Sequence, residues 1–229
     1  MVDGLSLSWV SDRHLRVSVG SDTSLATHQR VRAVYAALKR ARVESLRDMT
    51  PAYCTVLLSF DVVTLDAIQA EQAVRRALEG VTEGAETNPP RLVEIPVCYE
   101  GEYAPDLAEV AKAHDMTSDQ VAAMHSGAEY FVSFVGFVPG FAYLGGLPKQ
   151  LETPRLDRPR VKVPAGSVGI AGEQTGVYPF ATAGGWRLIG RTPLRVFDVL
   201  PERPGLMEMG DRVRFVRIGL EQFRAMGGA

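Results

Sequence analysis

The first hundred residues alternate between two patterns of apolar positions, one with a period of two residues and one with a period near 3.6. Residues 15–19 alternate apolar and polar side chains, as expected of a half-buried strand. Val31, Val34 and Leu38 fall on one stripe of a predicted helix that Ser24 caps. By the same criteria we predict strands at 15–19, 43–49, 53–60 and 91–98, and helices at 24–41 and 64–81.

This order of elements, strand-helix-strand-strand-helix-strand, is the ferredoxin-like arrangement. Residues 5–9 add one more predicted strand in front of it. The polar, proline-containing stretch at 83–90 is interpreted as a surface loop, because the strand after it completes the fold. We therefore predict a ferredoxin-like domain at residues 1–98.

The second part of the chain has a different composition. Two short helices are predicted at 105–114 and 117–125, the second opened by a Thr-x-x-Gln capping-box pattern. Gly and Pro then become frequent, and strand-like pieces recur at 131–137, 160–163, 168–171, 187–189, 194–197 and 212–218, before a final helix at 219–226. Many short strands separated by turns favour a closed β-barrel. We place this barrel domain at residues 99–229, which makes the fold class α+β.

The overall composition is that of an ordinary globular protein. Of 229 residues, 46% are hydrophobic and 23% charged, and the formal net charge is -2 with both signs mixed along the chain. Without a basic field of one sign, nucleic acid is not an expected partner. No apolar run is long enough for a membrane span, and the first twelve residues lack the pattern of a signal peptide. We expect a cytoplasmic protein whose cysteines, Cys54 and Cys98, are reduced thiols outside any metal site.

The region from residue 125 to 192 is rich in glycine, proline and aromatic residues and is the candidate binding region. Glycines let the backbone approach a ligand closely and expose N–H groups that hold anions, while aromatic rings wall an apolar pocket. The residues predicted to bind substrate are Phe137, Pro139, Gly140, Phe141, Tyr143, Pro164, Gly166, Ser167, Gln174, Thr175, Tyr178 and Trp186. The alternative is that the glycines and prolines only turn the corners of a small barrel.

Candidate catalytic residues are fewer. The chain has no GxxxxGK[ST] phosphate loop, and Ser167 lacks the glycine of a nucleophile elbow two positions before it, because Ala165 stands there. His125 ends a predicted helix just before the glycine-rich region and is the best acid–base candidate, with a helix-capping role as the alternative. Arg191 and Lys162 are candidates for neutralising phosphate or carboxylate charge, with surface ion pairs as the alternative.

A series of motifs in this region resembles a known family. The motifs are Pro96–Tyr99, Tyr103–Leu107, His125–Gly127, Gly136–Leu144, Pro154–Arg155, Arg160, Val163–Gly176, Tyr178–Pro179, Gly184–Trp186, Ile189–Pro193 and Phe197–Asp198. In this order they resemble the family of KipI and the 5-oxoprolinase B subunits, also called allophanate hydrolase subunit 1, closely over residues 91–218 and loosely before. Consecutive motifs in the right order are far more specific than any single one.

The resemblance implies a ferredoxin-like N-terminal domain and a cyclophilin-like β-barrel, in agreement with the patterns above. It implies a partner, the C subunit of the KipA type (allophanate hydrolase subunit 2), and a third component, the A subunit of 5-oxoprolinase. The implied reaction converts 5-oxoproline, a small cyclic amide, with ATP and water to glutamate, ADP and phosphate. We expect His125, Gln174 and Arg191 to supply part of a site at the interface with the C subunit, where ATP is also expected.

Two other functions are compatible with the same resemblance. KipI-type members inhibit a sporulation histidine kinase, which makes a regulatory binding protein the main alternative. The older family name points to allophanate or urea as substrate, but that activity requires a biotin carboxylase component or an amidase site that this chain does not show. The cyclophilin-like shape itself implies no prolyl isomerase activity, because a fold does not carry a function.

Overall fold

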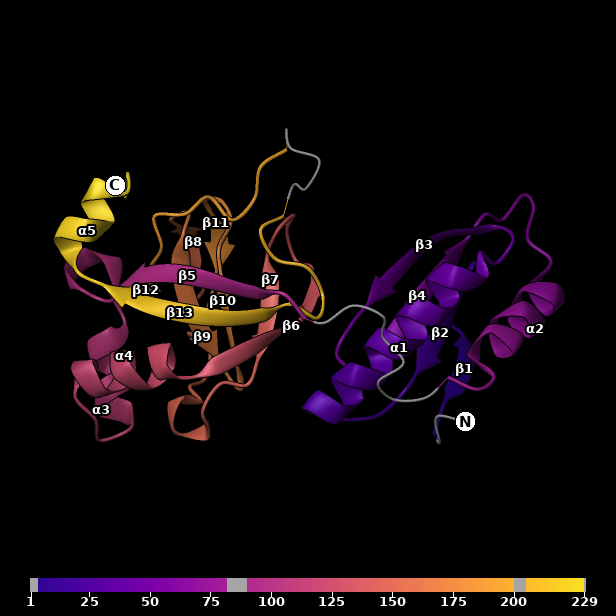
Figure 1. Ribbon diagram of the computed structural model, residues 1–229, viewed down its shortest axis with the longest axis horizontal. Coiled ribbons are helices and arrows are strands. Elements are labelled where there is room, and N and C mark those ends of the chain that lie inside the picture. Colours follow the sequence, from indigo (N-terminus) through magenta and orange to yellow (C-terminus); the bar gives the residue numbers. More distant parts are fainter. Residues whose placement is uncertain (1–3, 82–89, 200–204, 229) are drawn as a thin grey trace. The chain divides into compact units, whose positions relative to one another are not determined.

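The computed structural model describes residues 4–81, 90–199 and 205–228. The chain divides into two compact units, residues 1–89 and 90–229. The first is drawn in indigo to purple and the second in magenta to yellow (Figure 1). Each unit has its own sheet and its own helices.

The N-terminal unit is a four-stranded antiparallel sheet with two helices. Its elements are β1 (Ser6–Trp9), β2 (His14–Ser18), α1 (Leu25–Ala41), β3 (Leu46–Pro51), β4 (Thr55–Phe60) and α2 (Ala67–Leu78), with the strands in the order β1-β2-β4-β3. Along β4, buried Val56, Leu58 and Phe60 alternate with half-buried residues, so one face of the sheet is covered. Helix α1 packs against β3, β4 and α2.

Side chains at the helix N-termini explain where both helices begin. The Ser24 hydroxyl accepts a hydrogen bond from the Thr27 N–H at 3.2 Å, so α1 begins where the sequence predicted it. Helix α2 begins at Ala67 rather than at residue 64, because the Asp66 carboxylate accepts from two N–H groups of the first turn, at 3.1 and 3.0 Å. A carboxylate that satisfies two otherwise free donors sets the start of a helix.

The strand predicted at 91–98 does not close the N-terminal sheet, and the domain boundary moves with it. This strand is β5 (Leu92–Cys98), which lies in the C-terminal unit and pairs in parallel with β13 (Arg212–Ile218) along its whole length. In the N-terminal sheet the place beside β2 is taken by β1. The boundary therefore lies between residues 89 and 90 rather than between 98 and 99. An alternating pattern shows that a strand is half buried, but not which sheet it joins.

The loop predicted at 83–90 lies, apart from Pro90, outside the described residues. The strand predicted at 194–197 is absent. Pro193 lies just before it, and the Leu194 N–H donates to the Thr192 hydroxyl at 3.2 Å instead of to a neighbouring strand. In place of the predicted strand, this segment has an isolated β-bridge between Phe197 and Gly205.

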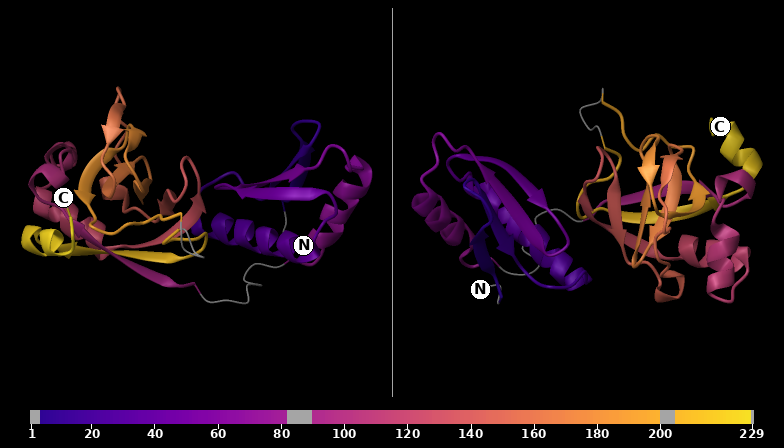
Figure 2. Two further views of the ribbon diagram at one scale, coloured as in Figure 1. Left: turned by 90° about the horizontal axis from the view of Figure 1, so that it is seen from above. Right: turned by 180° about the vertical axis from the view of Figure 1, so that it is seen from behind.

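Seven of the described strands of the C-terminal unit close into a barrel. They are β5, β6 (Glu129–Val135), β7 (Ala142–Gly145), β9 (Ser167–Ala171), β10 (Gln174–Val177), β12 (Arg187–Arg191) and β13, in the order β10-β7-β6-β13-β5-β12-β9. Figure 2 shows these strands from two further sides. Two shorter strands, β8 (Arg160–Val163) and β11 (Thr182–Gly184), pair with each other outside the barrel. The predicted α+β fold with a C-terminal barrel is confirmed.

Short helices complete the unit. They are α3 (Leu107–Ala113), α4 (Ser118–Gly127), α5 (Leu220–Ala225) and two 3₁₀ turns, η1 (Gly101–Tyr103) and η2 (Lys149–Leu151). The predicted capping box of α4 is present, because the Thr117 hydroxyl accepts from the Gln120 N–H at 3.2 Å and the Gln120 side chain accepts from the Thr117 N–H at 2.8 Å.

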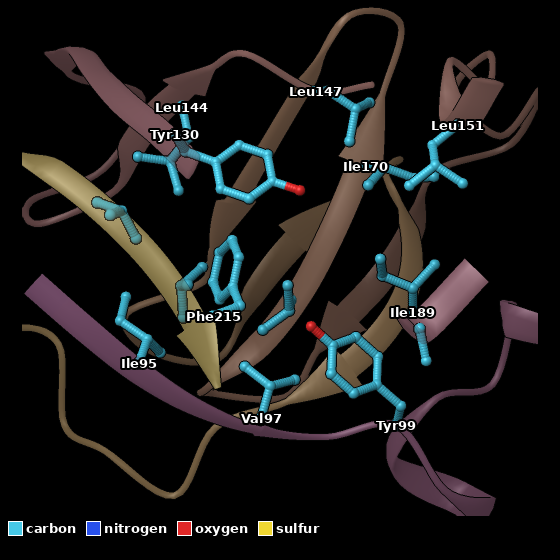
Figure 3. Close-up of a cluster of buried hydrophobic side chains, with 14 of the residues drawn as sticks. Ile95, Val97, Tyr99, Tyr130, Leu144, Leu147, Leu151, Ile170, Ile189 and Phe215 are labelled. Atoms are coloured by element: carbon cyan, nitrogen blue, oxygen red, sulfur yellow. The ribbon is translucent and has the colours of Figure 1, made fainter. Parts of the chain in front are cut away.

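The interior of the barrel is filled with side chains, so it is a packed core. Figure 3 shows the inward-pointing residues, among them Ile95, Val97, Leu144, Ile170, Ile189 and Phe215, none more than 1% exposed. They come from β5, β7, β9, β12 and β13, and the two on β5 are alternate positions of that strand, as the period of two along a strand requires. The hydroxyl groups of Tyr99 and Tyr130 also point inward (Figure 3).

A hydrogen-bonded histidine lies within this core. His125, on α4, is completely buried, with Nδ1 at 2.8 Å from the Tyr99 hydroxyl and Nε2 at 2.9 Å from the Thr175 hydroxyl. The Thr175 hydroxyl donates to the Gly169 carbonyl at 3.0 Å, so it accepts from the Nε2–H of His125. Tyr99 then donates to Nδ1, and the imidazole is neutral. Burial lowers the pKa of His125 to about 3 and raises the pKa of Tyr99.

The same histidine joins several elements of the barrel unit. The Tyr130 hydroxyl donates to the His125 carbonyl at 2.7 Å, and the Phe215 ring stacks on the imidazole with centroids 4.6 Å apart. Tyr130 lies on β6 and Phe215 on β13. His125 therefore links α4 to the strands around it through both its ring and its backbone.

The burial of His125 predicts that the barrel loses stability in mild acid. An unfolded histidine takes up a proton near pH 6.5, whereas folded His125 does so only near pH 3. Between these values the unfolded state binds more protons, so this residue lowers the free energy of unfolding by up to about 1.4 kcal/mol for each unit that the pH falls. His125→Gln, which takes up no proton, will be less stable at pH 7 but will lack this part of the pH dependence.

The measurement is urea unfolding from pH 7 to pH 4 in a Trp9→Phe background. Trp186 fluorescence then reports the barrel alone, because the chain has two tryptophans and Trp9 lies in the other unit. Carboxylates contribute equally to both proteins, so the difference between their slopes isolates residue 125. Equal slopes for the two proteins would contradict the neutral, buried state of His125.

Candidate functional site

Antiparallel pairing brings four strand ends to one end of the barrel. The start of β7 lies beside the end of β10, the end of β10 beside the start of β9, and the start of β9 beside the end of β12. The segments 136–140, 164–166 and 192–193 adjoin these strand ends. We call these three segments, together with Arg191, the barrel rim. Its members among the predicted site residues are Phe137, Pro139, Gly140, Pro164, Gly166 and Arg191.

Arg191 holds one turn of the rim and keeps part of its guanidinium available. Its Nε donates to the Ala165 carbonyl at 2.9 Å, and its guanidinium carbon lies 5.9 Å from the centroid of the Tyr103 ring. Within the part of the chain that the structure describes, no carboxylate pairs with Arg191 and its Nη atoms have no hydrogen-bond partner. The charge of Arg191 is therefore available to an anion.

Gly166 shapes the turn that Arg191 holds. Its φ is +77°, and a Cβ at this position would collide with the carbonyl oxygen of Thr192. The Thr192 N–H also donates to the Gly166 carbonyl at 2.9 Å. A glycine is needed here for both its conformation and its small size. This glycine serves the turn, while Pro164 and Ala165 beside it are exposed.

The segment 136–140 presents an aromatic ring to solvent. The Val138 N–H donates to the Gly136 carbonyl at 2.8 Å, and the φ of Phe137 is +68°, which together define a γ-turn centred on Phe137. The side chain of Phe137 is 60% exposed. Its ring meets the Phe141 ring edge-on, with centroids 5.6 Å apart. Pro139, beside it, is exposed as well.

Three aromatic residues predicted to bind substrate are buried instead. Phe141, Tyr178 and Trp186 form a second core with Val163 of β8, and they are 1%, 1% and 5% exposed. The Phe141 ring lies 5.2 Å from each of the other two rings. A Cβ on Gly176 would lie 3.1 Å from the Phe141 ring and 3.2 Å from the Trp186 ring, so this glycine makes room for packing. Here the alternative, glycines that serve the architecture of the barrel, is correct.

The three residues expected to act together are separated. His125 lies in the barrel interior with both ring nitrogens hydrogen-bonded. Gln174 begins β10 and therefore lies at the far end of the β9–β10 hairpin from the rim, where Arg191 is found. The structure therefore does not bring His125, Gln174 and Arg191 together in one place within this chain, because His125 lies in the barrel interior and the other two lie at opposite ends of β9.

Three other residues predicted to bind substrate are buried or packed against neighbouring side chains. Thr175 is fully buried beside His125, and Ser167 pairs with Arg191 across β9 and β12 but is only 4% exposed. Tyr143 is half-buried, with its ring stacked on that of Phe134 at 4.6 Å.

A buried ion pair that was not predicted from the sequence joins two of the motifs. The Asp106 carboxylate accepts from Arg160 Nη2 at 2.5 Å and from the Leu188 N–H at 2.6 Å. Asp106 is 4% exposed, so its charge is neutralised inside the protein. It fastens the start of α3 to β8 and β12. Asp106 and Arg160 both belong to the motifs, and this was the only sign in the sequence that they have a role.

The described residues were also compared with the requirements of thiol and metal chemistry and of a membrane span. Cys54 and Cys98 are free thiols, as predicted, and burial raises the pKa of Cys98. The described residues include no group of three or more His, Cys, Asp or Glu side chains placed to hold a metal ion. Among the described helices, none has the length and apolar character needed to cross a membrane.

Comparison with known proteins identifies relatives over nearly the whole chain. Residues 5–207 match the family described as carboxyltransferase domain, subdomain C and D. The chain is 37% identical over 226 residues to the 5-oxoprolinase B subunit of Bacillus subtilis (strain 168), which covers 94% of this chain and 94% of that one. It is 50% identical over 161 residues to the 5-oxoprolinase B subunit of Escherichia coli O157:H7, covering 70% and 72% of the two chains.

A solved structure gives the same result for the fold. TTHA0988 matches 90% of this chain with a TM-score of 0.78 and 37% sequence identity. This chain spans only 40% of the length of TTHA0988. On these matches, the chain belongs to the family of the carboxyltransferase domain, subdomains C and D, together with the 5-oxoprolinase B subunits.

Proposed function

We propose that this chain is the B subunit of an ATP-dependent 5-oxoprolinase, which converts 5-oxoproline, ATP and water to glutamate, ADP and phosphate. The proposal rests on the similarity to 5-oxoprolinase B subunits. The alignment with the Bacillus relative covers 94% of both chains. The names of these relatives favour the enzyme over the kinase inhibitor as the function of this chain.

The proposed enzyme is assembled from more than one polypeptide. The relatives are named as subunits, and TTHA0988 is a much longer chain of which this one spans 40%. We propose that the direct partner is the C subunit and that the A subunit is a further component. The barrel rim is the surface proposed to complete the site with the C subunit, since it holds Arg191 together with the exposed residues Phe137, Pro139 and Pro164.

The chemistry explains why such a site needs an anion-binding group. The carbonyl of a five-membered lactam is a poor electrophile, and transfer of a phosphoryl group to its oxygen turns that oxygen into a leaving group. Substrate carboxylate and transferring phosphoryl group are both anions that positioned cations stabilise. Arg191 is proposed for this role, because its Nη atoms have no protein partner within the described residues. With no GxxxxGK[ST] loop in the chain, the rest of the nucleotide is assigned to the partner.

His125 is proposed to support the enzyme by holding α4 and the barrel strands in place, and not by transferring a proton. Its ring is fully buried, its two nitrogens are hydrogen-bonded, and burial lowers its pKa to about 3. A general base works best when its pKa is near the working pH and a path to the substrate exists. Neither condition holds for His125, and its contacts hold α4 and the barrel strands in place.

The proposal is tested by reconstitution. We expect ADP and glutamate to appear when this chain is combined with the A and C subunits, ATP and 5-oxoproline, and no turnover when this chain is left out. Release of ADP is measured with and without 5-oxoproline, and glutamate is measured in parallel. A stable complex that hydrolyses no ATP in response to 5-oxoproline would contradict the proposed reaction.

Arg191→Ala in the reconstituted enzyme is expected to lower kcat/KM for 5-oxoproline by about 10²-fold, the usual effect of removing one charged group that stabilises developing negative charge. Arg191→Lys retains the charge but loses the planar fork of donors and is expected to recover part of the activity. Steady-state kinetics measure both.

The matched control is Arg214→Ala. Arg214 is an exposed arginine on β13 whose guanidinium lies 3.3 Å from the Glu94 carboxylate. A surface pair of this kind contributes little, so activity is expected to stay at the wild-type level. Full activity of Arg191→Ala in a complex that assembles normally would remove Arg191 from the site.

A further inference from the structure

Phe137 has an unfavourable backbone conformation for its residue type. Four described non-glycine residues have positive φ, and Phe137, at +68°, is the aromatic one among them. The γ-turn that it centres is a strained conformation for a bulky L-residue. Gly136 precedes it directly, so a glycine-rich segment carries a phenylalanine at the position where a glycine would be relaxed. Strain of this kind persists where the surrounding structure holds it.

The strained turn points an apolar ring away from the protein. Of the nine phenylalanines in the chain, only Phe137 and Phe180 are exposed, at 60% and 37%. The ring of Phe137 contacts the ring of Phe141. Phe141 is itself held in place, because it is 1% exposed and packs against Tyr178 and Trp186. The ring is therefore both exposed and held in one place, which is the condition for binding without a large loss of conformational entropy.

We propose that Phe137 is the residue that anchors this chain to the C subunit, by entering an apolar pocket on that protein. This inference rests on the proposed function, which supplies the partner. Exposed aromatic and arginine side chains are the residue types that most often dominate binding energy at protein interfaces. The rim carries one of each. Phe137 is assigned to the contact with the C subunit, and Arg191, which no described carboxylate pairs with, stays assigned to the substrate anion.

The similarity to TTHA0988 supports a protein as the occupant. This chain covers 40% of that protein, so most of the longer polypeptide lies outside the match and is joined covalently to a related domain. In the proposed function this chain meets the C subunit as a separate polypeptide, so surface contacts alone must hold the two together. The strain at residue 137 then raises the free energy of the isolated chain and leaves the ring already placed for binding.

The test compares two variants that both remove the ring but differ in backbone strain. Phe137→Ala keeps a Cβ at the positive φ, whereas Phe137→Gly removes the strain. Both are expected to weaken the Kd for the purified C subunit by about 30-fold or more, the effect of losing an interface anchor. The isolated Phe137→Gly chain is expected to have a Tm higher than that of Phe137→Ala by about 4 °C.

Two further variants complete the comparison. Phe137→Tyr keeps a ring of the same shape and is expected to bind within a few-fold of wild type. Val161→Ala, at a position 92% exposed on β8, is expected to leave both the Kd and the Tm unchanged. Binding is measured by calorimetry and turnover by ADP release from the reconstituted enzyme.

Each result has a distinct meaning. Wild-type affinity of both ring-less variants for the C subunit, in an enzyme that turns over, overturns this inference and leaves the proposed function intact. Wild-type affinity with a raised KM for 5-oxoproline also overturns it, and assigns the ring to the substrate. If the wild-type chain itself does not bind the C subunit, the assembly in the proposed function fails and this inference fails with it.

Discussion

The parallel pairing of β5 with β13 is the constraint on which the C-terminal unit depends. The two strands are matched residue by residue from Leu92–Arg212 to Cys98–Ile218. Because β5 also pairs with β12 and β13 with β6, this one ladder joins the two halves of the barrel. Arg91 and Asp211 reinforce its beginning, with Nη2 and Oδ2 at 2.6 Å. Without the ladder the sheet would have two open edges.

Closure of the barrel decides what its polar residues are able to do. Strand β5 leads directly to Tyr99, whose hydroxyl donates to His125 inside the barrel. The imidazole thereby becomes a buried, neutral group that joins α4 to the strands, and Thr175 completes its hydrogen bonds. The same closure leaves the rim as the exposed end where strand starts and strand ends meet. The buried hydrogen bonds of His125 and the recognition proposed for the rim thus belong to different parts of one motif-rich region.

Most of the glycine-rich motifs serve packing, and a few residues remain for recognition. Gly176 makes room for the rings of Phe141 and Trp186, and Gly166 forms the turn held by Arg191. At these two positions there is little room for a larger side chain. The proposed site is then half of a composite one, with Arg191 and Phe137 presented at its edge to another polypeptide.

The sequence by itself determined the local structure and the family. The caps at Ser24 and Thr117, the alternation along β4 and the density of turn residues after residue 130 act over a few residues, and their predictions were confirmed. Only the tertiary structure decided that β5 belongs to the barrel, that His125 is buried, and that Gln174 and Arg191 lie apart. These facts depend on contacts between residues far apart in the chain, such as Arg91 and Asp211, and no local pattern of side chains specifies which distant strand a given strand will join.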